Sequence, residues 1–240
     1  AKKKSGKTSL IGNLLAGCAA PNGATKVIIF ASTVNKDPTF AAIIKKLKKR
    51  GVPVLTSTSF YDQNGHDQLE ELVTTLMGED RVGGDLESAN SSDDEPEVET
   101  PLVYAPVSVP EGDPGGDEEP FPYKAPEYII VADDLGEELK NKRFHALLKK
   151  NRHARSKVIV SSQYYKDLVG TGPRTQLDNL ILFGGIPEEM LEQMHKEQNL
   201  TVPIEHFKKM YHHATRTKYN FLTTDVRNDV FRHNFDQKFV

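Results

Sequence analysis

The sequence predicts an α/β fold in which a mostly parallel sheet is covered by helices on both faces. Short β-branched runs alternate with amphipathic segments along two stretches, 1–78 and 127–240. Such alternation favours parallel strands joined by helices. A phosphate-binding pattern opens the first helix, and a pair of acids ends a later strand. We therefore expect a single nucleotide-binding domain built from the two stretches.

The individual elements follow from hydrophobic periodicity and from helix start signals. In the first stretch we expect helices over about 7–18, 38–49 and 69–76, and strands at 26–31 and 53–58. Asp37-Pro38 starts the second helix, with Asp as the cap and Pro at the first helical position. In the second stretch we expect strands at 127–132, 157–160, 180–183 and 219–226, with helices over 137–153, 187–198 and 203–215.

Residues 79–126 interrupt this pattern and are predicted to be a disordered, acidic insertion. Between Glu79 and Pro120 there are 14 acidic residues and one basic residue, Arg81. The formal net charge of −3 therefore conceals a body of about +10, which favours a nucleic-acid partner over a solvated surface. Cys18 is the single cysteine, which favours a reducing compartment, and no apolar run suits a membrane span.

The sequence Ser5-Gly6-Lys7-Thr8 matches the end of the pattern G-x-x-x-x-G-K-[ST], with Ala1 where the first glycine belongs. A glycine lets backbone N–H groups turn towards a phosphate, and the helix N-terminus adds partial positive charge. We expect Lys7 to reach the β- and γ-phosphates of ATP and the Thr8 hydroxyl to bind Mg²⁺. The strand that leads into such a loop is expected upstream of the sequence.

Polar residues follow two of the predicted strands. Asp133 and Asp134 end an apolar strand, as in a Walker B motif. Asp133 is therefore the candidate Mg²⁺ ligand, and Asp134 is the candidate base or water-positioning group. A helix cap is the alternative for both acids. Gln163 follows the next strand and is a candidate for sensing the γ-phosphate or orienting water. Arg152 is the candidate arginine finger acting on a neighbouring subunit, with Arg174 as the second choice.

Together, FASTVNKDPTF at 30–40, the strand ending in DDL and NRHARSKVIVSSQ at 151–163 resemble the genome-packaging ATPases of large DNA viruses. The C-terminal NFLTTDVRNDVFRHNFD is also similar to that poxvirus-type group, which includes virophage and Polinton-like enzymes of the FtsK–HerA superfamily. The resemblance covers roughly 1–60 and 127–240. The second Walker B acid is usually Glu in that superfamily, and here it is Asp134.

The resemblance implies a P-loop ATPase of the additional-strand type that assembles as a ring and drives double-stranded DNA into a capsid. It implies capsid or portal partners and a location in the virion or a virus factory rather than secretion. Two other functions remain open. A GTPase switch would use Asp133 to Gly136 as D-x-x-G, although the base-reading N-K-x-D is absent. The second alternative is a scaffold that binds nucleotide but has lost the ability to hydrolyse it.

Overall fold

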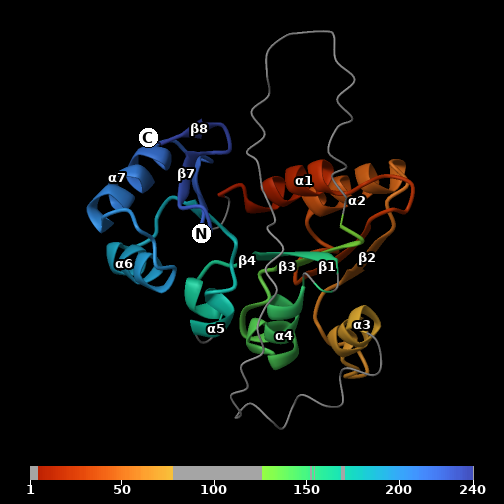
Figure 1. The fold of residues 1–240 in the computed structure, drawn as a ribbon. Coiled ribbons are helices and arrows are strands. Elements are labelled where there is room, and N and C mark those ends of the chain that lie inside the picture. The colour runs from red at the N-terminus through yellow and green to blue at the C-terminus, as the bar shows by residue number, and fades with distance from the viewer. Residues whose placement is uncertain (1–4, 78–125, 152, 154, 169–170, 240) are drawn as a thin grey trace, which may run out of the picture.

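The computed structural model describes residues 5–77, 126–151, 153, 155–168 and 171–239. The predicted acidic insertion at 79–126 therefore lies almost entirely outside the described residues. The described chain forms two four-stranded sheets, each with its own helices (Figure 1). Within these residues no helix combines the length and the apolar composition that crossing a membrane requires.

The first sheet is wholly parallel, with the strand order β2-β1-β3-β4. Its strands are β1 (Lys26–Ala31), β2 (Val54–Ser57), β3 (Tyr128–Asp133) and β4 (Ser156–Ser161). Its helices are α1 (Lys7–Cys18), α2 (Pro38–Lys49), α3 (Gln68–Met77), η2 (Gly136–Lys140) and α4 (Lys142–Lys150). The predicted class of fold is confirmed, and so is the cap on α2, where the Asp37 carboxylate accepts from the Thr39 N–H at 2.8 Å.

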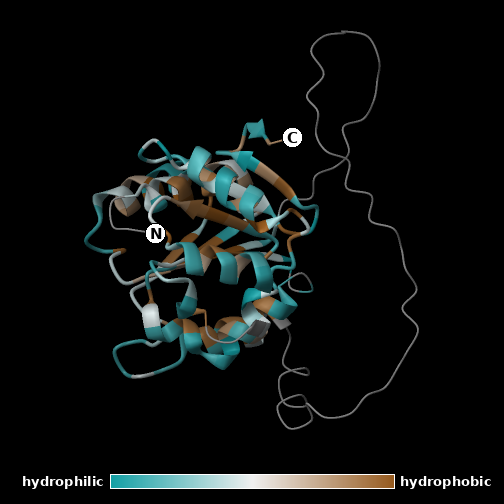
Figure 2. Cartoon of the chain, turned by 90° about the vertical axis from the view of Figure 1, so that its left-hand side faces the viewer, coloured by the Kyte–Doolittle hydropathy of each residue, from teal (hydrophilic) through white to brown (hydrophobic). Residues whose placement is uncertain are grey.

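Alternate residues of β1 and β3 face opposite sides of the sheet, so the sheet has two cores. Val27, Ile29 and Val131 pack under α1 and α2. On the other face, Ile28, Phe30 and Ile130 pack against α3 and α4. Figure 1 shows these two helix pairs on either side of the sheet, and Figure 2 shows the apolar strands between more hydrophilic helices.

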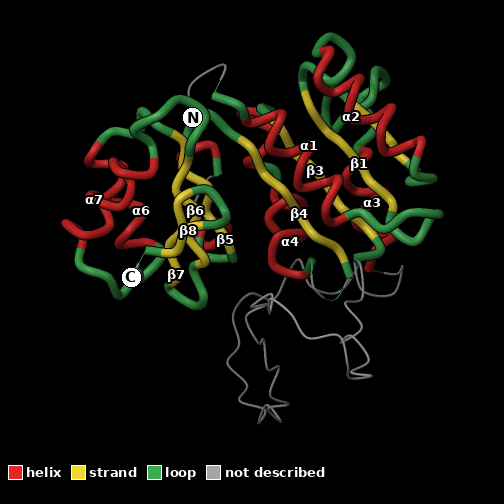
Figure 3. Tube along the Cα trace, turned by 90° about the horizontal axis from the view of Figure 1, so that it is seen from above, coloured by secondary structure: helices red, strands yellow, loops and turns green. Residues whose placement is uncertain are grey.

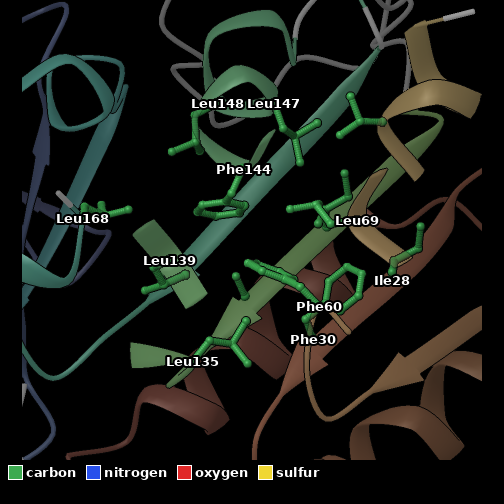
Figure 4. Packing of buried hydrophobic residues seen from close by; sticks show 13 residues of the cluster. Ile28, Phe30, Phe60, Leu69, Leu135, Leu139, Phe144, Leu147, Leu148 and Leu168 are labelled. Carbon is green, nitrogen blue, oxygen red and sulfur yellow. The ribbon is translucent and has the colours of Figure 1, made fainter. Parts of the chain in front are cut away.

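Three aromatic rings anchor the second of these cores. Phe60 lies 5.0 Å from the Phe30 ring and 5.3 Å from the Phe144 ring, centroid to centroid. Figure 4 shows the three side chains pointing towards one another from three different segments. Because each ring is almost fully buried, this contact fixes the loop after β2 and the start of α4 against β1.

The second sheet differs from the sequence prediction because it is antiparallel, with the order β5-β6-β7-β8. Its strands are β5 (Asn179–Phe183), β6 (Phe221–Asp225), β7 (Val230–His233) and β8 (Gln237–Lys238). Helices α6 (Glu188–Glu197) and α7 (Ile204–Ala214) pack against it, and the short helices η3 (Tyr165–Asp167) and α5 (Thr171–Arg174) precede β5 in the chain. The sequence predicted one final strand at 219–226. The structure has three antiparallel strands from there on, because β6, β7 and β8 are joined by short turns.

Candidate nucleotide site

The N-terminus of α1 has the geometry of an anion site. Gly6 precedes the helix with φ of 96°, a left-handed conformation that glycine adopts without steric cost. The first turn of α1 contains no acidic residue and Gly6 offers no side-chain cap. Its first backbone N–H groups are therefore free of any side-chain acceptor from the cap position, as a phosphate-binding helix requires.

Parallel pairing brings the carboxyl ends of three strands to one edge, where the predicted Walker B acid lies. Asp133 is in register with Ala31 of β1 and Ser161 of β4. Only 5% of its surface is exposed. Burial raises the pKa of Asp133, and the nearby Asp134 and Asp37 raise it further, while the Ser161 hydroxyl and the Lys7 ammonium lower it. The predicted partners Lys7 and Asp133 are thus close enough to interact.

Three buried oxygen atoms at this site have no hydrogen-bond partner within the described part of the chain. They are Oγ of Ser5, Oδ1 of Asp133 and Oγ of Ser161. Buried polar atoms normally have partners, and an exception calls for a ligand, water or ion. A hydroxyl and a carboxylate oxygen suit hard, oxygen-binding species such as Mg²⁺ and the groups bound with it. The donor set at the phosphate loop therefore fits a magnesium nucleotide.

Asp134 and Gln163 meet at the same edge, as a catalytic pair would. The Gln163 side-chain amide donates to both carboxylate oxygens of Asp134, at 3.0 and 2.9 Å. Asp134 has φ of 52°; its N–H donates to the Ser161 carbonyl at 2.9 Å and its carbonyl accepts from the Ser32 hydroxyl at 3.2 Å. The helix-cap alternative is wrong for both acids, because Asp133 ends β3 and Leu135 is the N-cap of η2.

The two candidate arginines have different outcomes. Arg152 lies outside the described residues, so its role stays a prediction. Arg174 is 7% exposed and forms an ion pair with Glu197, with Nε 2.9 Å from Oε2. Its guanidinium also lies 5.1 Å from the centre of the Tyr165 ring. In this arrangement the buried Arg174 side chain holds α5 against α6.

Sequence reasoning missed two residues at the site. Asp37 was assigned only as a helix cap, yet its carboxylate is close enough to raise the pKa of Asp133. The position of Asp37 after β1, the strand that pairs with β3, could have indicated that it lies near Asp133. Tyr219 also approaches the phosphate loop: a Cβ placed on Gly6 would lie 3.3 Å from Cδ1 of Tyr219. Nothing in the local sequence indicates that contact between segments more than 200 positions apart.

Several solved structures of one viral packaging protein share this architecture. The genome packaging NTPase B204 of Sulfolobus turreted icosahedral virus 2, in complex with AMP, matches with a TM-score of 0.53 and 16% identity. That match covers 96% of this chain and 92% of the other. The chain has the fold of this packaging NTPase. B204 in complex with ATP-γS matches with a TM-score of 0.51 and 15% identity, over the same shares of the two chains.

A related structure, the DNA-packaging ATPase B204 from Sulfolobus turreted icosahedral virus, gives a TM-score of 0.53 at 14% identity, covering 96% of this chain and 92% of the other. No protein-family model matches the chain. No curated protein matches it either. At these identities the similarity lies in the fold, and the site residues rest on their own geometry.

The raised pKa of Asp133 leads to a prediction about stability without ligand. Because the folded state favours the neutral acid, its stabilising contribution is present below the ordinary aspartate pKa of about 3.9 and is lost as pH rises through the raised pKa. We expect Asp133→Asn, which is neutral at every pH, to melt at a higher temperature than the wild type at pH 7. The difference should narrow towards pH 4.

Thermal unfolding followed by circular dichroism measures this effect, with Asp236→Asn as a control at an exposed carboxylate. The control is expected to leave the melting temperature unchanged at both pH values. A lower melting temperature for Asp133→Asn at pH 7 would contradict the prediction. It would mean that the contacts of the carboxylate with Lys7 and Ser161 outweigh its burial.

Proposed function

We propose that this protein is an ATPase that drives double-stranded DNA into a viral capsid. The observation that carries the proposal is the meeting of three features at one edge of a parallel sheet. These are the uncapped helix start at Gly6, the buried Asp133 near Lys7, and the Asp134–Gln163 pair. Solved structures of the same fold described as genome packaging NTPases, including complexes with ATP-γS and AMPPCP, support it.

In this proposal the phosphate loop binds the nucleotide. Backbone N–H groups from Ser5 to Lys7 would hold the phosphates, and the Lys7 ammonium would offset their charge. The Thr8 hydroxyl and the Asp133 carboxylate would hold Mg²⁺. The ion would supply charge neutralisation between the phosphates when it is bound. Its positive charge would also favour ionised Asp133, reversing the effect that burial has on the pKa in the free protein.

Asp134 is the residue we propose as the base that orients the attacking water. Each carboxylate oxygen has two lone-pair directions, so the bonds from Gln163 leave capacity for a water proton. Gln163 would hold the carboxylate in one orientation and report changes near the γ-phosphate to β4. Asp37, Asp133 and Asp134 would share this edge, so their mutual repulsion would ease when a cation binds.

The proposed DNA contacts rely on exposed lysines. On α2, Lys45, Lys48 and Lys49 are exposed and line an open surface groove with Val34, Asn35, Ala41 and Ile44. Lysines contact DNA phosphates without reading bases, which suits a motor that moves along any sequence. The stretch 206–218 is a second source, although Lys208 is engaged by Glu192 at 2.6 Å.

Assembly and location also remain proposals. We propose a homo-oligomeric ring in which Arg152 acts on the neighbouring nucleotide, with capsid or portal proteins as further partners. The proposed location is the virion or the infected cell. The description of B204 as a genome packaging NTPase supports this context, and the basic surface of α2 supports the DNA partner.

We also propose that the stretches 1–78 and 127–240 form a single domain, as the sequence predicts. Among the described residues, β4 pairs only with β3, and β5 only with β6. Figure 3 shows β4 on the side of its sheet that faces the second sheet.

The test of the proposed function is ATP hydrolysis in the presence of DNA. We expect duplex DNA to stimulate phosphate release, and Lys7→Ala to reduce it by about 100-fold or more, because a charge that stabilises the transition state is lost. Lys196→Ala, which changes an exposed lysine of α6, is the matched control. Hydrolysis indifferent to DNA, with no DNA binding at low salt, would contradict packaging. A strong preference for GTP over ATP would favour the GTPase switch. Nucleotide binding without hydrolysis would favour the scaffold that has lost turnover.

Asp134→Asn separates nucleotide binding from hydrolysis. Asparagine tolerates the positive φ at this position and is nearly the same size, so the fold should be retained. We expect hydrolysis to fall by about 100- to 10,000-fold, as when a general base is removed. The affinity for AMPPCP, measured by calorimetry, should stay within a few-fold of the wild type. A variant that still hydrolyses ATP at near wild-type rate would exclude Asp134 as the base.

The salt dependence of DNA binding tests the α2 surface. Replacing Lys45, Lys48 and Lys49 by alanine should reduce the slope of log affinity against log salt concentration by about 2 to 3, since each lost phosphate contact contributes about 0.9. Fluorescence anisotropy with a labelled duplex measures the slope. The control replaces three other exposed lysines, Lys142, Lys149 and Lys166. Equal losses in both variants would show that α2 is not a preferred DNA surface.

A further inference from the structure

The turn between α7 and β6 brings an aromatic side chain to the phosphate loop. A Cβ placed on Gly6 would lie 3.3 Å from Cδ1 of Tyr219 and 4.0 Å from Cε1 of Phe183. Gly6 therefore packs directly against the Tyr219 ring, with Phe183 at the limit of contact. This is a meeting of the two sheet units, because Gly6 belongs to the first and both aromatic residues belong to the second.

Tyr219 differs from Phe183 in its exposure. Phe183 is buried at 5% exposure, whereas 57% of Tyr219 remains exposed although its ring touches the loop. The Lys218 ammonium lies 4.8 Å from the centre of the Tyr219 ring. A large aromatic side chain with a cation over it thus stays open to solvent beside the place where phosphates would bind.

The backbone at Tyr219 is also in an unfavourable conformation. Its φ of 75° is left-handed, a region that residues with large side chains rarely adopt. The preceding turn holds it there, since the Asn220 N–H donates to the Thr217 carbonyl at 3.2 Å. Strain of this kind persists where the surrounding structure requires it, and it gathers at ligand sites. Here it directs the ring of Tyr219 towards Gly6.

We propose that Tyr219 is the stacking surface for the base of the bound nucleotide, with the Lys218 ammonium over its ring. The proposal rests on the proposed function for the identity of the ligand. Gly6 contacts the ring near Cδ1, and the exposed remainder of the ring can lie flat against a base whose phosphates occupy the loop. Stacking on an aromatic ring tolerates any base, because every base has a flat π-face. It therefore accommodates the lack of a base-reading N-K-x-D pattern in the sequence.

The experiment compares a ligand that has a base with one that has none. Magnesium AMPPCP and magnesium tripolyphosphate are titrated by calorimetry into the wild type, Tyr219→Ala and Tyr219→Phe. We expect Tyr219→Ala to weaken AMPPCP binding by about 5- to 100-fold, the range for loss of one stacked base. Tripolyphosphate affinity should change by less than about two-fold, and Tyr219→Phe should bind both as the wild type does.

A matched control is Tyr61→Ala, at a tyrosine that is 43% exposed in the loop after β2. Equal weakening of both ligands in Tyr219→Ala would overturn the proposal, because Tyr219 would then only position the loop. No weakening of either ligand, or a wild type that binds AMPPCP no more tightly than tripolyphosphate, would also overturn it. DNA-stimulated hydrolysis by the wild type is scored separately, so the proposed function can fail while base stacking holds.

The absence of tryptophan from the sequence provides an independent readout. Tyr219→Trp introduces a single tryptophan at the proposed stacking position. We expect its fluorescence to be quenched by AMPPCP and unaffected by tripolyphosphate. Equal responses to both ligands would show that the ring senses only the phosphate loop.

Discussion

The register of the parallel strands β1, β3 and β4 is the constraint on which the candidate site depends. Because their carboxyl ends are aligned, Asp133 lies between Ala31 and Ser161 at one edge of the sheet. The residues that follow these strands then converge: Ser32 bonds to Asp134, and Gln163 bonds to the Asp134 carboxylate. A slip of one residue in β3 would turn Asp133 to the opposite face and remove the convergence.

The buried carboxyl group of Asp133 connects the fold with the proposed binding of a magnesium nucleotide. Asp133 is held in a position that disfavours its ionised form, with an unpaired oxygen and two other carboxylates nearby. Such an arrangement costs stability in the free protein and is relieved when a cation with bound phosphates arrives. On the face under α3 and α4, the aromatic contacts of Phe60 with Phe30 and Phe144 hold β1 against α4 and the loop after β2.

Both sheet units contribute residues around the phosphate loop. The first sheet supplies the acids and the helix N-terminus, whereas the second supplies Tyr219 and Phe183 next to Gly6. Gly6 is therefore constrained twice, by its left-handed φ and by the ring that a Cβ would meet. Any side chain there would strain the backbone, and its Cβ would crowd the Tyr219 ring, which would have to shift by a few tenths of an ångström.

The sequence by itself determined the parallel α/β unit and the start of α1 and α2, and it indicated Lys7, Asp133, Asp134 and Gln163 as candidate site residues. These follow from local periodicity, caps and motif order, which are properties of neighbouring residues. Only the tertiary structure decided that Arg174 is bound to Glu197, that Asp37 lies near Asp133, that the second sheet is antiparallel, and that Tyr219 touches Gly6. Those features depend on which distant segments pack together, and no local pattern records that choice.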